Sequence, residues 1–252
     1  MNYKQEIEEP NNAIEIHELR KSFGSNHVIN GFNLDVKEQE SVAVLGQSGS
    51  GKSVLIKCVI GLIKADSGSI KVLGKDVLNL KQAQLDEVRT KIGFLFQSNA
   101  LYDSMTVREN LEFPLRRLRL MESKLKTEKL VKEALEDVNL PNTIDLMPSE
   151  LSGGMKKRIS IARTLIIRPK IILYDEPTTG LDPITSKEIN VLMNKVHEKY
   201  QTSSVIISHD LGCIQRTADR IIILKNGINY KEGTFSELKN SSDPWVNAFF
   251  NT

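Results

Sequence analysis

Residues 40–53 read ESVAVLGQSGSGKS, a short apolar stretch that runs into a glycine-rich loop. Residues 40–45 have the length and composition of a buried strand. After the loop, apolar side chains recur at helical spacing, at Val54, Leu55, Cys58, Val59 and Leu62. The sequence therefore predicts a strand, a loop and a helix in direct succession, as in sheets whose strands alternate with helices.

The loop fits the pattern G-x-x-x-x-G-K-[ST]. Glycines let the backbone wrap around an anion, and the following helix directs its positive end toward the same point. Lys52 is expected to reach the β- and γ-phosphates of a nucleotide, and the Ser53 hydroxyl is expected to bind Mg²⁺. The whole predicted phosphate loop consists of Gly46, Gln47, Ser48, Gly49, Ser50, Gly51, Lys52 and Ser53.

The rest of the chain alternates between strand-like and helix-like segments. Residues 14–45 look rich in strands, and further strands are expected at 92–96, 171–174, 204–207 and 221–224. Asn226-Gly227 is a hairpin signal. Helices are expected within residues 98–150 and over 184–200. This order predicts an α/β sheet that is interrupted by a helical insert.

Composition limits the classes of protein that the chain can belong to. Its net charge is +2 over 252 residues, which gives no reason to expect nucleic acid as a partner. No apolar run approaches the roughly 18 residues of a membrane span. Residues 1–12 are acidic and lack the apolar core of a signal peptide, so we expect a flexible leader. Cys58 and Cys213 form no CxxC pair and no disulfide framework, as expected in a reducing cytoplasm.

A second acidic motif follows the apolar run at residues 171–174. Asp175 and Glu176 come directly after this expected strand. A buried strand would hold Asp175 rigidly in the coordination sphere of Mg²⁺. The next residue, Glu176, points elsewhere and is expected to act as the general base that polarises an attacking water.

A third motif, Leu151-Ser152-Gly153-Gly154, precedes the helix-like residues 155–163. A small hydroxyl, two glycines and a helix N-terminus make a second device for binding an anion. The motif alone fits an ordinary helix start equally well. Together with the phosphate loop, it favours two nucleotides, each held between the loop of one subunit and the Ser152–Gly154 segment of another.

Over residues 14–250 the chain resembles the ATPases of ABC transporters. Seven family motifs occur in order, and they lie at Phe23, 46–53, Gln97, 151–154, 171–176, 180–182 and His209. Phe23 stands where the family often has Tyr, and Met155 stands where Gln is usual. A phenyl ring still stacks on adenine, and the Ser-Gly-Gly sequence is intact.

The resemblance implies a P-loop NTPase (RecA-like) core with an N-terminal antiparallel β subdomain and an inserted α-helical subdomain. The ATPase domain would span 13–252, with the core and β subdomain in 13–97 and 165–252 and the helical subdomain in about 98–164. It also implies that Gln97 touches Mg²⁺ or the attacking water, that His209 contacts the γ-phosphate, and that Asp182 lies at a dimer interface. The residues expected to bind the nucleotide are then Phe23, Gly46 to Ser53, Gln97, Ser152, Gly153, Gly154 and Asp182.

The same resemblance implies the partners. They are a second copy in a head-to-tail dimer and an integral-membrane permease, which would place the chain on the cytoplasmic face of the inner membrane. Residues 102–110, 155–158 and 243–246 look like ATPases of Mla-type (MCE-associated) lipid transporters, whose periplasmic partner is an MCE lipid-binding protein. The expected cargo is phospholipid, moved to maintain the lipid asymmetry of the outer membrane.

Alternative functions remain at this point. A polar amino-acid uptake ATPase is the nearest, although its signature more often has Gln at position 155. A soluble ABC ATPase of DNA repair would need a long coiled coil, yet fewer than 100 residues without sustained heptads separate Ser53 from Leu151. A GTPase would need Asn-Lys-x-Asp, and residues 194–197 lack its Asp. The basic cluster Arg116, Arg117 and Arg119 fits either a solvated helix face or contact with a permease loop or anionic lipid headgroups.

Overall fold

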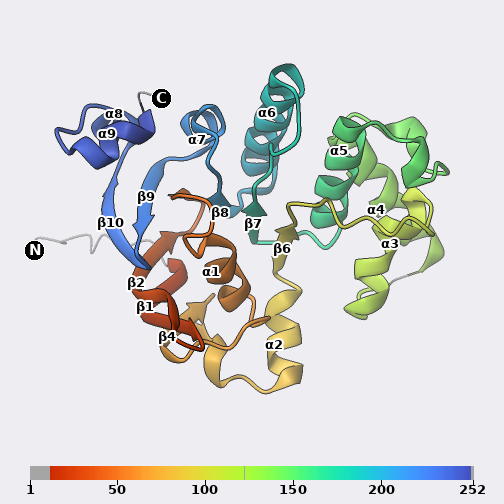
Figure 1. The fold of residues 1–252 in the computed structure, drawn as a ribbon. Coiled ribbons are helices and arrows are strands. Elements are labelled where there is room, and N and C mark those ends of the chain that lie inside the picture. The colour runs from red at the N-terminus through yellow and green to blue at the C-terminus, as the bar shows by residue number, and fades with distance from the viewer. Residues whose placement is uncertain (1–11, 122, 251–252) are drawn as a thin grey trace, which may run out of the picture.

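The computed structural model describes residues 12–121 and 123–250, whose strands form two sheets (Figure 1). The antiparallel sheet has four strands in the order β2-β1-β4-β5. Their bounds are Asn26–Lys37 for β2, Asn12–Phe23 for β1, Ser67–Val72 for β4 and Lys75–Asp76 for β5. Asn12, which the sequence assigned to the leader, begins strand β1. The rest of the predicted leader, residues 1–11, lies outside the described residues.

The larger sheet has six strands in the order β10-β9-β3-β8-β7-β6. Their bounds are Ile228–Gly233, Arg220–Lys225, Ser41–Leu45, Ser203–Ile207, Ile171–Asp175 and Ile92–Leu95 in that order. All neighbours are parallel except β10 and β9, which form the hairpin expected at Asn226-Gly227. Every residue of β3, β7 and β8 is buried, because helices or the second sheet cover both faces. The predicted α/β fold is confirmed.

Helices complete the architecture (Figure 1). The α-helices are α1 (Lys52–Val59), α2 (Gln82–Arg89), α3 (Val107–Arg117), α4 (Lys124–Asp137), α5 (Gly153–Leu165), α6 (Pro183–Tyr200), α7 (Leu211–Thr217), α8 (Phe235–Lys239) and α9 (Pro244–Phe250). Short 3₁₀ turns occupy Val77–Asn79, Pro141–Thr143 and Pro148–Glu150. Among the described residues, no helix combines the length and the apolarity that crossing a bilayer demands.

The helical insert lies to one side of the larger sheet, where α3, α4 and α5 gather (Figure 1). Its core contains Val131, Ala134 and Leu135, which lie on one face of α4 as their spacing predicts. The same cluster includes Leu95 and Tyr174 from strands β6 and β7. The helices of the insert therefore pack against the sheet through α5 and share one continuous core with it.

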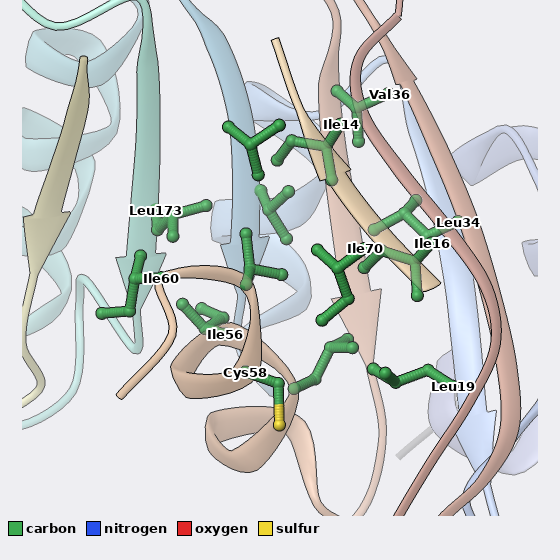
Figure 2. Packing of buried hydrophobic residues seen from close by; sticks show 14 of the residues in the cluster. Ile14, Ile16, Leu19, Leu34, Val36, Ile56, Cys58, Ile60, Ile70 and Leu173 are labelled. Carbon is green, nitrogen blue, oxygen red and sulfur yellow. The ribbon is translucent and has the colours of Figure 1, made fainter. Parts of the chain in front are cut away.

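Helix α1 lies between the two sheets (Figure 2). Ile16 and Ile70 project from the antiparallel sheet toward Ile56 and Cys58 of α1, and Leu173 of β7 lies on the other side. All five belong to one buried cluster. This packing fixes where α1 begins, and therefore where the loop that precedes it must lie.

Helix α1 is shorter than the sequence pattern predicts. It ends at Val59, Ile60 is its C-cap, and Gly61 takes a left-handed φ of 66° that stops the helix. Leu62 lies beyond this stop with 55% of its surface exposed, so its expected place on the apolar helix face is wrong. The apolar repeat in the sequence continues beyond Gly61, the residue that ends the helix.

The two leucines of this pattern provide a test of the packing. Leu55 is completely buried, so Leu55→Ala should lower the free energy of unfolding by about 2–5 kcal/mol. Leu62→Ala, the matched control, should change it by no more than about 0.5 kcal/mol. Urea denaturation followed by circular dichroism measures both, and equal losses in the two variants would contradict the placement of Leu62.

Candidate active site at the carboxyl ends of the parallel strands

The phosphate loop connects β3 to α1 and fits closely against its neighbours. A Cβ added to Gly46 would lie 2.8 Å from the carbonyl oxygen of Leu224 and 2.8 Å from Ser50 Oγ. Gly51 has a φ of +100°, and a Cβ there would lie 2.7 Å from a methyl carbon of Val28. Both positions therefore require glycine, because a side chain would displace the loop from the sheet edge.

The Lys52 side chain folds back over this loop. Its Nζ donates to the carbonyl oxygens of Gly46 at 2.8 Å and Gln47 at 3.0 Å. Burial lowers the pKa of the Lys52 ammonium, and the nearby carboxylates of Glu176 and Asp175 oppose that change. The loop thus presents a buried ammonium whose present partners are neutral carbonyls, an arrangement suited to an incoming anion.

Ser53 and Asp175 meet at the end of strand β7. The Ser53 hydroxyl donates to Asp175 Oδ1 at 3.0 Å. Burial raises the pKa of the Asp175 carboxyl, and the bond from Ser53 opposes this change. Within the described part of the chain, no group of three or more His, Cys, Asp or Glu side chains could hold a metal ion. One carboxylate and one hydroxyl fit Mg²⁺, which usually takes few protein ligands and completes its shell with phosphate and water oxygens.

Glu176 occupies a strained position immediately after this strand. Its φ of 52° lies in the left-handed region, and its N–H donates to the carbonyl of Ile207 at 2.9 Å. The carboxylate accepts a hydrogen bond from Thr179 Oγ1 at 3.1 Å and lies 2.8 Å from His209 Nδ1. The His209 side chain is 67% exposed, whereas that of Glu176 is 11% exposed. These contacts direct a buried carboxylate and an exposed imidazole toward the same space.

That space is a cavity of about 560 Å³, which is within the range of small-molecule sites. Strands β1 and β2, helix α1, the loop after β6 and the C-terminal helix all reach its wall. Its lining consists of Phe23, Val28, Gly46, Gln47, Ser48, Gly49, Gly51, Lys52, Ser53, Val54, Gln97, Glu176, His209 and Phe249. Phe23 is 50% exposed, so it is an accessible ring and not a core aromatic. The structure therefore brings the predicted Phe23, Gln97, Glu176 and His209 together around the phosphate loop.

The Ser152–Gly154 segment does not join this cavity. Ser152 is exposed, and its hydroxyl caps helix α5 by accepting from the Met155 N–H at 3.2 Å. A Cβ on Gly154 would lie 2.8 Å from a methyl carbon of Thr185, so glycine is needed for contact with helix α6. A single chain thus leaves this predicted anion site open to solvent.

Asp182 lies near the same contact. Its carboxylate caps helix α6 by accepting from the N–H groups of Ile184 and Thr185, both at 3.0 Å, and from the Thr185 hydroxyl. These bonds hold the pKa of the Asp182 carboxyl below its usual value, the hydroxyl of Thr185 most strongly. Its structural role in this chain is that of a helix cap, and Thr185 connects it to the Ser152–Gly154 segment.

Helix α5 also holds the loop that contains Gln97, which the sequence did not predict. Lys157 Nζ donates to the Gln97 carbonyl at 3.2 Å, and Ser160 Oγ donates to the Asn99 carbonyl at 3.0 Å. One turn later, the Arg163 guanidinium donates to the Asn99 carbonyl at 2.9 Å. The three donors lie on one helix face because they are three residues apart. They attach the Gln97 loop to the helix that begins at the Ser152–Gly154 segment.

Lys157 is the unexpected member of this face. It is only 1% exposed, and burial lowers its pKa to about 8. The sequence shows a basic run of Lys156, Lys157 and Arg158, which is usually solvent-facing. The available signal was the apolar period of the helix: Ile161 lies four residues after Lys157, and that spacing puts Lys157 on the inner face.

Comparisons with known proteins agree with this geometry. The family model described as ABC transporter matches residues 29–179. The chain is 37% identical over 254 residues to the Arabidopsis thaliana chloroplastic protein TRIGALACTOSYLDIACYLGLYCEROL 3, covering 94% of this chain and 72% of that one. It is 38% identical over 220 residues to the methionine import ATP-binding protein MetN of Brucella abortus, covering 87% of this chain but only 59% of MetN.

Solved structures give the same result. The ATP-binding cassette MJ0796, in a dimeric post-hydrolysis state with ADP and Pi, superposes with a TM-score of 0.80 at 32% identity, covering 88% of this chain and 98% of that one. The protein cbiO1 from Clostridium perfringens, part of the ABC transporter complex cbiONQ, superposes with a TM-score of 0.82 at 28% identity, and 90% of each chain is covered.

The Ser53–Asp175 pair makes a prediction about Mg²⁺. Ser53→Ala removes one hard oxygen from the pair, so ATP hydrolysis should need a Mg²⁺ concentration about tenfold higher or more. Ser48→Ala is the matched control, since that loop residue is expected to act through its backbone N–H, and its Mg²⁺ dependence should stay that of the wild type. Phosphate release measured over a Mg²⁺ titration distinguishes them. An unchanged midpoint in Ser53→Ala would refute the assignment.

Proposed function

The chain belongs to the ABC transporter ATP-binding family and is an ATPase of that family, and from that premise we propose that it drives lipid movement through a separate permease. The expected cargo is phospholipid, and the expected role is maintenance of outer-membrane lipid asymmetry. The main support for an ATP-driven role is the cavity in which Lys52, Glu176 and His209 lie around the phosphate loop.

The geometry supports a distinct role for each residue of the cavity. Lys52, already held by carbonyls, would exchange them for the β- and γ-phosphate oxygens of ATP. Ser53 and Asp175 would hold the Mg²⁺ that accompanies ATP, with Gln97 as a further contact, and this ion neutralises the charge that develops on the phosphates.

Hydrolysis would depend on the Glu176–His209 pair. Glu176 would accept the proton of the attacking water, since its carboxylate is buried and directed by Thr179. His209, 2.8 Å from that carboxylate and largely exposed, would fix the orientation of the pair and approach the γ-phosphate. Both side chains come from the carboxyl ends of neighbouring parallel strands, where α/β sheets bind their ligands.

A head-to-tail dimer would complete the site. Ser152 and Gly153 are exposed and lie outside the cavity of their own chain, so a second copy could present them to the bound nucleotide. The similar cassette MJ0796 is dimeric in its post-hydrolysis state with ADP and Pi. We propose the same arrangement here, with Asp182 near the interface.

A second cavity, of about 450 Å³, offers a place for the permease. It is bounded by the aromatic pairs Phe94–Phe96 and Tyr102–Phe113, whose ring centroids lie 4.2 and 4.6 Å apart. Arg117 of the basic cluster contributes to its lining. Phe96 directly precedes Gln97, so a permease loop bound here would contact the segment that reports on the nucleotide. Such a permease would place the chain on the cytoplasmic face of the inner membrane.

Two observations support lipid as the cargo. Residues 102–110, 155–158 and 243–246 resemble those of ATPases that work with MCE lipid-binding proteins. One similar protein also carries the name of a glycolipid, trigalactosyldiacylglycerol. The competing function is amino-acid uptake, which the 38% identity to methionine import proteins favours.

The hydrolytic assignment predicts the behaviour of Glu176→Gln. An amide cannot accept the proton of water, so kcat should fall by about 10²–10⁴-fold while ATP binding persists. The variant should also accumulate as an ATP-bound dimer in size-exclusion chromatography. Glu87→Gln, which alters an exposed carboxyl paired with Lys75, is the control and should turn over normally. Wild-type turnover by Glu176→Gln would show that another group is the base.

The cargo assignment predicts which lipid is bound to the complex when the chain is purified from the membrane with its permease. The permease that co-purifies with it should carry phospholipid above the level found on an unrelated membrane protein in the same detergent. Extraction and mass spectrometry measure this. A complex that instead contains an amino-acid-binding protein and no excess phospholipid would transfer the assignment to amino-acid uptake.

A further inference from the structure

The C-terminal helix α9 reaches the nucleotide cavity, although no motif of the sequence assigned it a role there. Phe249 lines the same cavity as Phe23, the phosphate loop and Glu176. Phe23 comes from the end of strand β1, whereas Phe249 lies 226 residues later, near the end of the described chain. Two aromatic rings from opposite ends of the chain therefore border one cavity.

A tight set of contacts fixes the start of α9. Asp243 caps it by accepting from the N–H groups of Trp245 at 2.8 Å and Val246 at 3.2 Å, and it also accepts from the Tyr230 hydroxyl at 2.7 Å. Lys225 Nζ lies 4.1 Å from the ring centroids of both Tyr230 and Trp245. These bonds attach the helix to the hairpin of β9 and β10.

One face of α9 is buried in the core, and another faces the cavity. Val246 and Phe250 are buried in the core beneath the helix, together with Leu45 and Ile223 of the sheet. Phe249 is only partly buried. Its ring packs edge-on against that of Trp245, with the two ring centroids 4.8 Å apart. Because Val246 and Phe250 hold the helix down, Phe249 is placed on the cavity side as part of a rigid element.

Trp245 extends this wall along the phosphate loop. It lines an adjoining cavity of about 270 Å³ together with Gln47, Ser48, Gly49 and Ser50. Val28 and three of these loop residues, from Gln47 to Gly49, line both cavities. The Trp245–Phe249 pair therefore runs beside the loop and ends in the nucleotide cavity.

We propose that the purine base of the nucleotide lies between Phe23 and Phe249, so that helix α9 supplies the second wall of the base-binding site. This inference rests on the cavity being the ATP site, as proposed above. The phosphates would occupy the loop, and the base would extend to the apolar part of the cavity at Phe23, Val28 and Phe249. A purine has two aromatic faces, and the ring of Phe23 can cover only one of them.

The chain carries its own reporter for this contact, because Trp245 is its single tryptophan. Binding of the Mg²⁺ complex of a non-hydrolysable ATP analogue to the full chain should change Trp245 fluorescence saturably. Tripolyphosphate, which fills the loop but has no base, should give a clearly smaller change, since it reaches Trp245 only from the side of the loop. An equal response to tripolyphosphate, or no response to the analogue, would overturn the proposal.

Calorimetry on variants tests the stacking directly. Phe249→Ala should weaken binding of the analogue by about 5- to 30-fold and leave tripolyphosphate binding unchanged. Phe249→Tyr should restore the affinity, since the ring is retained. Asn247→Ala, on the same helix, is the matched control and should bind as the wild type does. An unchanged far-UV circular dichroism spectrum, together with retained tripolyphosphate binding, shows that Phe249→Ala remains folded.

The outcomes separate this inference from the proposal on which it rests. If the wild type binds the analogue, Phe23→Ala weakens that binding and Phe249→Ala does not, then the second wall is wrong and the ATP site stands. If Phe249→Ala loses tripolyphosphate binding as strongly as analogue binding, its effect lies in the loop and the stacking role is refuted. If the wild type binds neither ligand, the assignment of this cavity as the ATP site is wrong.

Discussion

The contact between Ser53 and Asp175 depends on the order of strands β3, β8 and β7 in the larger sheet. These residues lie 122 positions apart, yet their oxygens are within 3.0 Å. Ser53 lies in the first turn of α1, which follows β3, and Asp175 ends β7, with β8 as the strand between β3 and β7. Parallel strands end at the same edge of a sheet, so this order brings the hydroxyl and the carboxylate together. His209 follows β8 and therefore arrives at the same edge.

The close fit of the phosphate loop is the second constraint. Gly46 and Gly51 have no room for a side chain, because Leu224 of β9 and Val28 of β2 occupy that space. The two sheets therefore meet at the loop, and helix α1 between them holds its far end. The loop that would bind the ligand is therefore in direct contact with the packed core. A change in the packing between the sheets would also move the loop.

Helix α5 connects the exposed Ser152–Gly154 segment with the loop that contains Gln97. Its N-terminus carries the exposed Ser152–Gly154 segment, and its inner face holds the carbonyls of the Gln97 loop through Lys157 and its neighbours. Gln97 in turn lines the nucleotide cavity. A helix that contacts both segments would connect the nucleotide with the second subunit proposed at its N-terminus and the permease proposed in the cavity beside Phe96.

The sequence by itself determined the alternation of strands and helices, the phosphate loop and the acidic pair after β7, since each is written in consecutive residues whose chemistry is local. It also indicated Phe23, Gln97 and His209 through the resemblance of ordered motifs. Only the tertiary structure decided that helix α1 stops before Leu62, that Lys157 is buried against the Gln97 carbonyl, and that Phe249 borders the cavity. These contacts depend on which distant segments pack together. The apolar period of α5 indicates that Lys157 faces inward, but not which carbonyl it contacts.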